Sequence, residues 1–227
     1  MLRTKLLATV AALAMISGAS VAMAGNSATI NQSNDGGSNQ SNTATVEQVN
    51  SGGGSNSADI TQTNKNGSNQ SNEATVKQVN KGGSGDQSND ATVKQTNKNG
   101  DNQSNRADVK QVNKGGKDQK NTADITQKNK DGKDQKNVAD VRQINKDGSK
   151  QSNDLKLKQV NKDGHDQSNT ADVRQINKGG HDQSNAADIT QKNKGGFGQK
   201  NALKLIQKNK DARTPVKMAF VPMVRHR

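Results

Sequence analysis

Residues 169–177 read Asn-Thr-Ala-Asp-Val-Arg-Gln-Ile-Asn, and this nine-residue pattern decides the fold. Asn, Ala, Val, Gln and Asn occupy every second position. Strict alternation is typical of a β-strand, in which successive side chains point to opposite faces. One face would carry two apolar residues between amides, and the other would carry Thr, Asp and Arg. We predict a strand whose amide-and-apolar face is buried.

The pattern recurs twelve times along the chain. Its Gln returns after sixteen residues in nine of eleven intervals, and the other two intervals are 14 and 17 residues. Between copies lie Lys-Gly-Gly, Lys-Asn-Gly or Lys-Asp-Gly, whose Gly, Asn and Asp residues tolerate positive φ in turns. A repeat of this kind is typical of a solenoid or an array. We therefore predict an all-β protein, a β-solenoid of twelve 16-residue strand–turn repeats. The twelve glutamines are Gln32, Gln48, Gln62, Gln78, Gln95, Gln111, Gln127, Gln143, Gln159, Gln175, Gln191 and Gln207.

The return path of the chain favours two repeats in each turn of the solenoid. Within one 16-residue repeat, the Gly/Lys/Asp segment would have to return almost fully extended and would offer nothing apolar opposite Ala and Val. The next repeat is a better return strand, which gives a rung of thirty-two residues. Alternate copies also differ, since Val49, Val79 and Val112 follow Gln in even copies, where odd copies have Ser33, Thr63 and Thr96. A 16-residue rung and an antiparallel meander are the alternatives.

The inward amides suggest how the rungs are held together. In parallel stacking, identical amides can hydrogen-bond along a column, and buried amides are costly unless they are paired. Terminal rungs would expose strand edges, and the first copy begins directly after a predicted cleavage site without an evident cap. We expect this ladder to be extended by a further molecule. The candidate ladder residues are Asn72, Ala74, Val76, Gln78, Asn80, Asn105, Gln111, Asn169, Gln175, Asn185 and Gln191.

The composition argues against enzymatic chemistry. Only 26% of the 227 residues are hydrophobic, 1% are aromatic and none is Cys, whereas an ordinary globular domain is about 45–50% apolar. No nucleophile, base and orienting group recur together. His165 and His181 would lie at opposite edges of a two-copy rung, and the repeated calcium-solenoid signature is absent. We expect no enzyme activity, no metal, no cofactor and no small-molecule substrate.

The two ends of the chain differ from the repeats. Residues 1–24 have the form of a secretory signal peptide: Arg3 and Lys5, then an apolar run, then Ala22 and Ala24 as the cleavage motif. Residues 25–210 are the repeat region, and residues 211–227 form a basic and apolar tail. We expect a secreted, extracellular protein.

The net charge is +13, and lysine recurs in the turns. Lysines occupy one turn position in ten successive copies and would form positive edges when stacked. Such edges attract anionic surfaces or extracellular DNA without sequence specificity. The other interpretation is that they keep the chain soluble before export. The lysines are Lys65, Lys81, Lys98, Lys114, Lys130, Lys146, Lys162, Lys178, Lys194 and Lys210.

The spacing Asn-x-Ala-x-x-x-Gln, met for example by Asn42, Ala44 and Gln48, resembles the curlin repeat of bacterial curli subunits. Here Gln is followed two positions on by Asn, where curlin repeats have a Gly-rich turn. The resemblance implies a secreted β-solenoid that polymerises, alone or with a related subunit, into an extracellular amyloid fibre for adhesion and biofilm matrix. A minor nucleator at the cell surface and a monomeric solenoid adhesin remain alternatives; irregular outward Thr disfavours ice binding.

Overall fold

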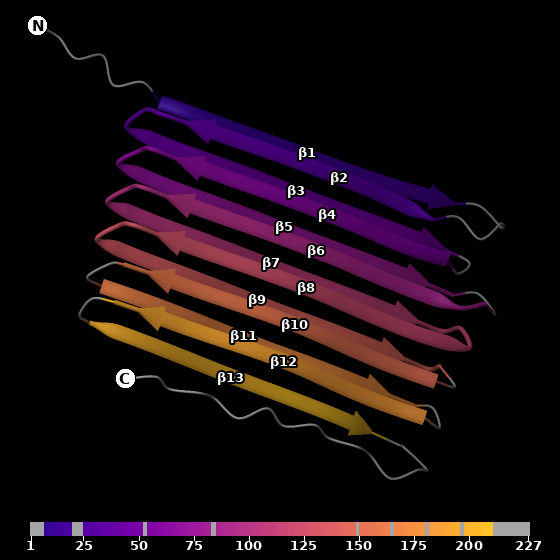
Figure 1. Cartoon of the computed structure of the whole chain (residues 1–227). Helices are drawn as coiled ribbons and strands as arrows, with labels where there is room; N and C mark the ends of the chain where they lie inside the picture. The colour runs from indigo at the N-terminus through magenta and orange to yellow at the C-terminus, as the bar shows by residue number, and fades with distance from the viewer. Residues whose placement is uncertain are drawn as a thin grey trace, which may run out of the picture.

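The computed structural model describes residues 7–19, 25–51, 54–82, 85–148, 150–163, 166–179, 182–195 and 198–210, and side chains from residue 25 onward. These residues form thirteen β-strands stacked into a two-layered slab (Figure 1). Among them, no helix is long and apolar enough to cross a membrane. The strands are β1 (Leu7–Ala19), β2 (Asn26–Asp35), β3 (Asn39–Ser51), β4 (Gly54–Lys65), β5 (Asn69–Lys81), β6 (Gln87–Lys98), β7 (Asn102–Lys114), β8 (Asp118–Lys130), β9 (Asp134–Lys146), β10 (Lys150–Lys162), β11 (Asp166–Lys178), β12 (Asp182–Lys194) and β13 (Gln199–Lys210).

The chain alternates between two parallel sheets. The odd-numbered strands form a seven-stranded sheet in the order β1-β3-β5-β7-β9-β11-β13, and the even-numbered strands form a six-stranded sheet. Each strand pairs in parallel with the strand two places further along, so that Asn72 lies beside Asn105 and Gln78 beside Gln111. The prediction of a β-solenoid with two repeats in each rung is confirmed. Parallel pairing excludes the antiparallel meander.

The strands are longer than the nine-residue pattern predicts. Strand β11, for example, spans Asp166–Lys178 rather than 169–177. The alternation continues backwards through a further inward residue, Gln167, which is 1% exposed. Because backbone pairing with β9 also begins at Asp166, the Asp-Gln-Ser segment belongs to the strand and not to the turn.

A narrow apolar strip fills the centre of the slab. Each rung contributes small and branched residues such as Ala44, Val46 and Ile60, all at most 2% exposed. Leu155 and Leu157 replace the usual pair in β10 and are buried equally well. Since so little apolar surface is available, the amides beside this strip carry an unusual share of the packing.

The turns place one residue after Lys in the left-handed region, as predicted from the Asn, Asp and Gly content. Asn99 has φ 57°, Asp131 has φ 58° and Gly115 has φ 71°. The N–H of this residue donates to the Lys carbonyl one rung further on, as from Asp131 to Lys162 at 3.1 Å. The turns therefore stack in the same register as the strands.

Strand β1 lies at one end of the stack, opposite β13 (Figure 1). It pairs with β3 along its whole length, from Leu7 beside Asn39 to Ala19 beside Ser51. The apolar part of the predicted signal peptide thus occupies one place in the seven-stranded sheet. The predicted cleavage residues Ala22 and Ala24, the histidines His165 and His181, and the tail 211–227 lie outside the described residues.

Candidate functional site

Columns of glutamine run through the interior along the stacking direction. The Nε2 of Gln111 donates to Oε1 of Gln78 at 3.0 Å and to the backbone carbonyl of Thr122, on the opposite sheet, at 2.7 Å. Its own Oε1 accepts from Gln143 at 2.9 Å. Each such glutamine therefore links neighbouring rungs and also joins the two sheets.

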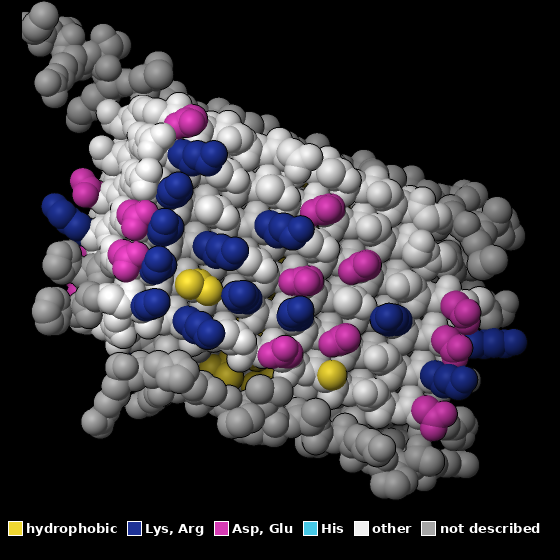
Figure 2. All heavy atoms as spheres, in the orientation of Figure 1, with side chains coloured by type: hydrophobic (Ala, Val, Ile, Leu, Met, Phe, Trp, Pro, Cys, Tyr) yellow, Lys and Arg dark blue, Asp and Glu magenta, His cyan; other side chains and the backbone are white. Residues whose placement is uncertain are grey.

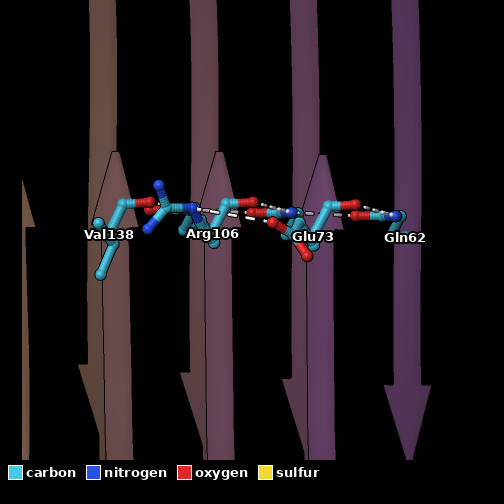
Figure 3. A network of polar contacts seen from close by, with 6 residues as sticks. Gln62, Glu73, Arg106 and Val138 are labelled. Atoms are coloured by element: carbon cyan, nitrogen blue, oxygen red, sulfur yellow. Dashed lines mark hydrogen bonds and ion pairs between the residues drawn. The ribbon is translucent and has the colours of Figure 1, made fainter. Parts of the chain in front are cut away.

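The same links occur on the other side of the slab. Gln62 Nε2 donates to the carbonyl of Glu73 at 2.8 Å, and its equivalents two and four strands later donate to the carbonyls of Arg106 and Val138. Figure 3 shows Glu73, Arg106 and Val138 side by side on successive strands, with Gln62 reaching toward them. The outward side chains of Glu73 and Arg106 also approach each other, at 3.8 Å.

Asparagine columns flank the glutamines and donate in the opposite direction. Asn72 Nδ2 donates to Asn105 Oδ1 at 3.0 Å, one rung toward the C-terminus, and to Asn97 Oδ1 across the slab at 2.8 Å. Glutamine donors point instead toward the N-terminal rung, as from Gln175 to Gln143. Two opposed sets of amide hydrogen bonds thus run the length of the molecule.

The structure places every candidate ladder residue on an inward face. Nine lie in the seven-stranded sheet and are fully buried, whereas Asn185 and Gln191 lie in β12 and are 3% and 6% exposed. Ala74 and Val76 belong to the apolar strip, and the others belong to the amide columns. The nine are Asn72, Ala74, Val76, Gln78, Asn80, Asn105, Gln111, Asn169 and Gln175.

The columns end abruptly at the C-terminal rung. Asn209 Oδ1 accepts from Asn177 at 3.1 Å, but its buried Nδ2 has no partner among the described residues. Gln191 Nε2 donates to Gln159 at 2.9 Å, but its buried Oε1 is likewise unpartnered. In earlier rungs, the equivalent Asn Nδ2 donates to the next rung, and the equivalent Gln Oε1 accepts a hydrogen bond from the next rung. Unsatisfied buried polar atoms cost free energy, so this end is suited to a further rung.

A second glutamine column, absent from the sequence prediction, lies at the start of the strands. Gln119 Nε2 donates to the carbonyls of Gly115 and Lys146, each at 2.7 Å, and thereby ties the strand to the turns. The buried Oε1 atoms of Gln87, Gln119 and Gln151 have no partner among the described residues. The signal for this column was a Gln two positions before the first Asn of most copies.

The turn lysines divide into two columns at opposite edges, because successive strands run in opposite directions. Lys65, Lys98 and Lys130 end strands of the six-stranded sheet, and Lys81 and Lys114 end strands of the seven-stranded sheet. In Figure 2, a row of basic side chains runs down one side of the molecule. The predicted positive edges are therefore present as two separate stripes.

A column of carboxylates lies on the outer face of the seven-stranded sheet. Asp108 lies beside Asp140, and Asp140 lies beside Asp172. Partial burial, followed by repulsion from Asp108 and Asp172, raises the pKa of Asp140, while Arg106 and Arg142 act in the opposite direction. Among the described residues, no group of three or more potential metal ligands is placed to hold an ion.

These features define a class of protein: a two-sided parallel β-solenoid with amide columns along its interior. Comparison of the chain with protein-family models, curated proteins and solved structures finds no match in any of the three.

Proposed function

We propose that this chain is the structural subunit of a secreted, curlin-like extracellular amyloid fibre that serves adhesion and biofilm matrix. The observation that carries the proposal is the interrupted amide ladder of the C-terminal rung. Asn209 Nδ2 and Gln191 Oε1 are buried and lack partners among the described residues. A second copy stacked on this rung would satisfy both atoms.

The repeat pattern makes the two ends complementary. If a second copy that begins at Gly25, and so lacks β1, follows in register, its β2 pairs with β12 and its β3 pairs with β13. Asn209 would then donate to Asn50 of the second copy, as Asn177 donates to Asn209. Gln191 would accept from Gln32 of the second copy, just as Gln32 accepts from Gln62.

Stacking of this kind is directional. Asparagine donors point toward the C-terminal end and glutamine donors toward the N-terminal end. Two C-terminal ends brought together would place donor against donor in one column and acceptor against acceptor in the other. Head-to-tail addition avoids this conflict and gives an open filament rather than a closed dimer.

Fibre formation by the chain that begins at Gly25 tests the proposal. We expect a lag phase, then fibres that bind an amyloid dye and diffract with a meridional spacing of about 4.7–4.8 Å. Preformed fibres should remove the lag. A chain that remains monomeric for days at high micromolar concentration, with or without seeds, would support the monomeric adhesin instead.

A further inference from the structure

The outer face of the seven-stranded sheet carries one continuous apolar column. Its members are aligned from strand to strand in the parallel register. Val79 and Val112 are 8% exposed, and the other members are partly exposed. Over five strands the column extends about 19 Å, at roughly 4.8 Å per strand. The apolar column consists of Val49, Val79, Val112, Ile144 and Ile176.

Basic side chains border this column on both sides. On β5, β7, β9 and β11, the residues two positions before it form an inner basic column, and the residues two positions after it form an edge basic column. The two basic columns are about 13 Å apart, since four residues of strand separate them. The inner basic column is Lys77, Lys110, Arg142 and Arg174, and the edge basic column is Lys81, Lys114, Lys146 and Lys178.

The edge basic column carries the unpaired charge of this band, whereas the carboxylates Asp108, Asp140 and Asp172 lie two positions before the inner basic column on the same face. Lys77 pairs with Glu47, but none of the other seven basic side chains forms an ion pair with a described residue. Like charges repeat along each column at about 4.8 Å, a separation at which they repel. An anionic partner would relieve this repulsion.

The six-stranded sheet provides an internal contrast. Its equivalent outward positions are polar or charged apart from Val160, for example Thr96 and Lys128. Its edge lysines Lys130 and Lys162 pair with the neighbouring Asp131 and Asp163. Figure 2 faces this sheet and shows basic side chains at one side but no apolar column. Among the described residues, an apolar column bordered by an edge basic column without ion pairs is therefore found on the seven-stranded sheet and not on the six-stranded sheet.

We propose that this band of the seven-stranded sheet, the apolar column with its two basic columns, binds an anionic lipid surface. Lys and Arg have long apolar stems that can lie outward and place their charged ends at the level of lipid phosphates. The apolar column would then face the region just below the headgroups. Binding of this type combines apolar contact with attraction to anionic lipid.

A nucleic acid fits the same band less well. Its phosphates could pair with the basic columns but would leave the apolar column without a partner. No aromatic side chain is available among the described residues to stack on bases. DNA could bind the lysine stripe of the six-stranded sheet equally well, so DNA binding would not explain why the apolar column lies on the seven-stranded sheet.

Vesicle co-sedimentation of the freshly purified full chain tests this proposal, and it needs no fibre. The probes are phosphatidylglycerol–phosphatidylcholine vesicles, pure phosphatidylcholine vesicles and duplex DNA. We expect the chain to bind the phosphatidylglycerol–phosphatidylcholine vesicles and not the pure phosphatidylcholine vesicles. The double substitution Val112→Thr with Ile144→Thr should weaken binding to the anionic vesicles about threefold or more. Thr keeps the β-branched shape that suits a strand, but the apolar contact with the lipid is lost. The matched control is Val138→Thr with Val160→Thr, outward apolar residues away from the band, and it should bind like the original chain.

Charge substitutions provide the second arm. Lys114→Gln with Lys146→Gln should reduce vesicle binding about tenfold, whereas Lys130→Gln with Lys162→Gln, at the opposite edge, should have a much smaller effect. Circular dichroism confirms that each variant is folded. Equal losses for the two faces, no effect of the apolar substitutions, or binding to DNA but not to vesicles would each overturn the lipid proposal.

Discussion

At the scale of single residues, amides take the place that large apolar side chains have in most proteins. Each inward Asn, and each Gln of the central columns, depends on the same residue one rung above and one rung below for part of its hydrogen bonding. Gln78, for instance, donates to Gln48 at 2.9 Å and accepts from Gln111 at 3.0 Å. A substitution therefore affects three rungs, because it removes the donor to Gln48 Oε1 and one of the two acceptors of Gln111 Nε2.

Replacement of Gln78 and Asn80 by Ala should lower the free energy of unfolding by several kcal/mol, since each orphaned buried partner costs about 1–3 kcal/mol. Replacement of the outward Lys77 and Lys81 by Ala should cost no more than about 1 kcal/mol. Urea unfolding followed by circular dichroism measures both. Similar losses in the two double variants would mean that the inward amides contribute no more than surface charge.

The carboxylate column gives a pH-dependent prediction. Because the pKa of Asp140 is raised by burial and by Asp108 and Asp172, the folded chain holds this proton more tightly than the unfolded chain. The ionised carboxylate therefore destabilises the fold as pH rises through the folded pKa. Asp140→Asn should stabilise the protein by a few tenths of a kcal/mol at pH 7, and the gain should vanish at pH 3.

Asp59→Asn is the matched control for this substitution. Asp59 lies on the six-stranded sheet between Thr29 and Thr92, with no carboxylate directly beside it. Thermal unfolding at both pH values should show no comparable gain. A gain in stability at neutral pH for both variants would mean that the lower number of negative charges, rather than the carboxylate column, is responsible.

At the scale of strands and turns, alternation of side chains predicted the inward face of the repeat strands β2 to β13 correctly. It missed the true strand starts, such as Asp166, because Asp-Gln-Ser is also a common loop composition. Whether those residues pair depends on the neighbouring strand in the next rung, and the sequence of a single repeat does not include that strand. The amide directions and the position of β1 are likewise properties of stacked rungs, and no local pattern reveals them.

Glycines in the turns test how closely the rungs approach. A Cβ on Gly132 would lie 2.2 Å from the carbonyl oxygen of Gly100, whereas a Cβ on Gly85 would meet nothing within 4 Å. Gly132→Ala should therefore force the backbone to shift and lower the thermal unfolding midpoint by several degrees. Gly85→Ala is the control and should leave it nearly unchanged. Equal midpoints would mean that the turns are not packed against one another.

At the scale of the whole molecule, repeated lysines set the conditions for the proposed assembly. In a fibre, the stripes that contain Lys65 and Lys81 would recur in every copy at about 4.8 Å per rung, with Asp35 and Ser51 in place of Lys in the first rung of each copy. Their repulsion opposes the approach of free subunits. Because the Debye length falls from about 8 Å at 0.15 M salt to about 3 Å at 1 M, salt should shorten the lag of the chain that begins at Gly25.

Duplex DNA should shorten the same lag at low salt by neutralising the stripes, and high salt should release DNA from finished fibres. Dye-binding kinetics over a salt series, with and without DNA, give both results. A lag that lengthens with salt and ignores DNA would argue against lysine stripes that recur along the fibre.

Strand β1 makes the two sheets unequal, with seven strands on one side and six on the other. If a neighbouring molecule paired its β13 with β1 of this chain, the neighbour's β12 would be separated from this chain's β2 by the width of one missing strand. Without β1, both sheets have six strands, and both edges can close at once. In the proposed fibre, a chain that retains residues 1–24 would then cap the end to which it binds. Small amounts of full-length chain should therefore halt growth at the N-terminal end of the seeds and leave growth at the C-terminal end unchanged, and proteolytic removal of residues 1–24 should restore growth at both ends.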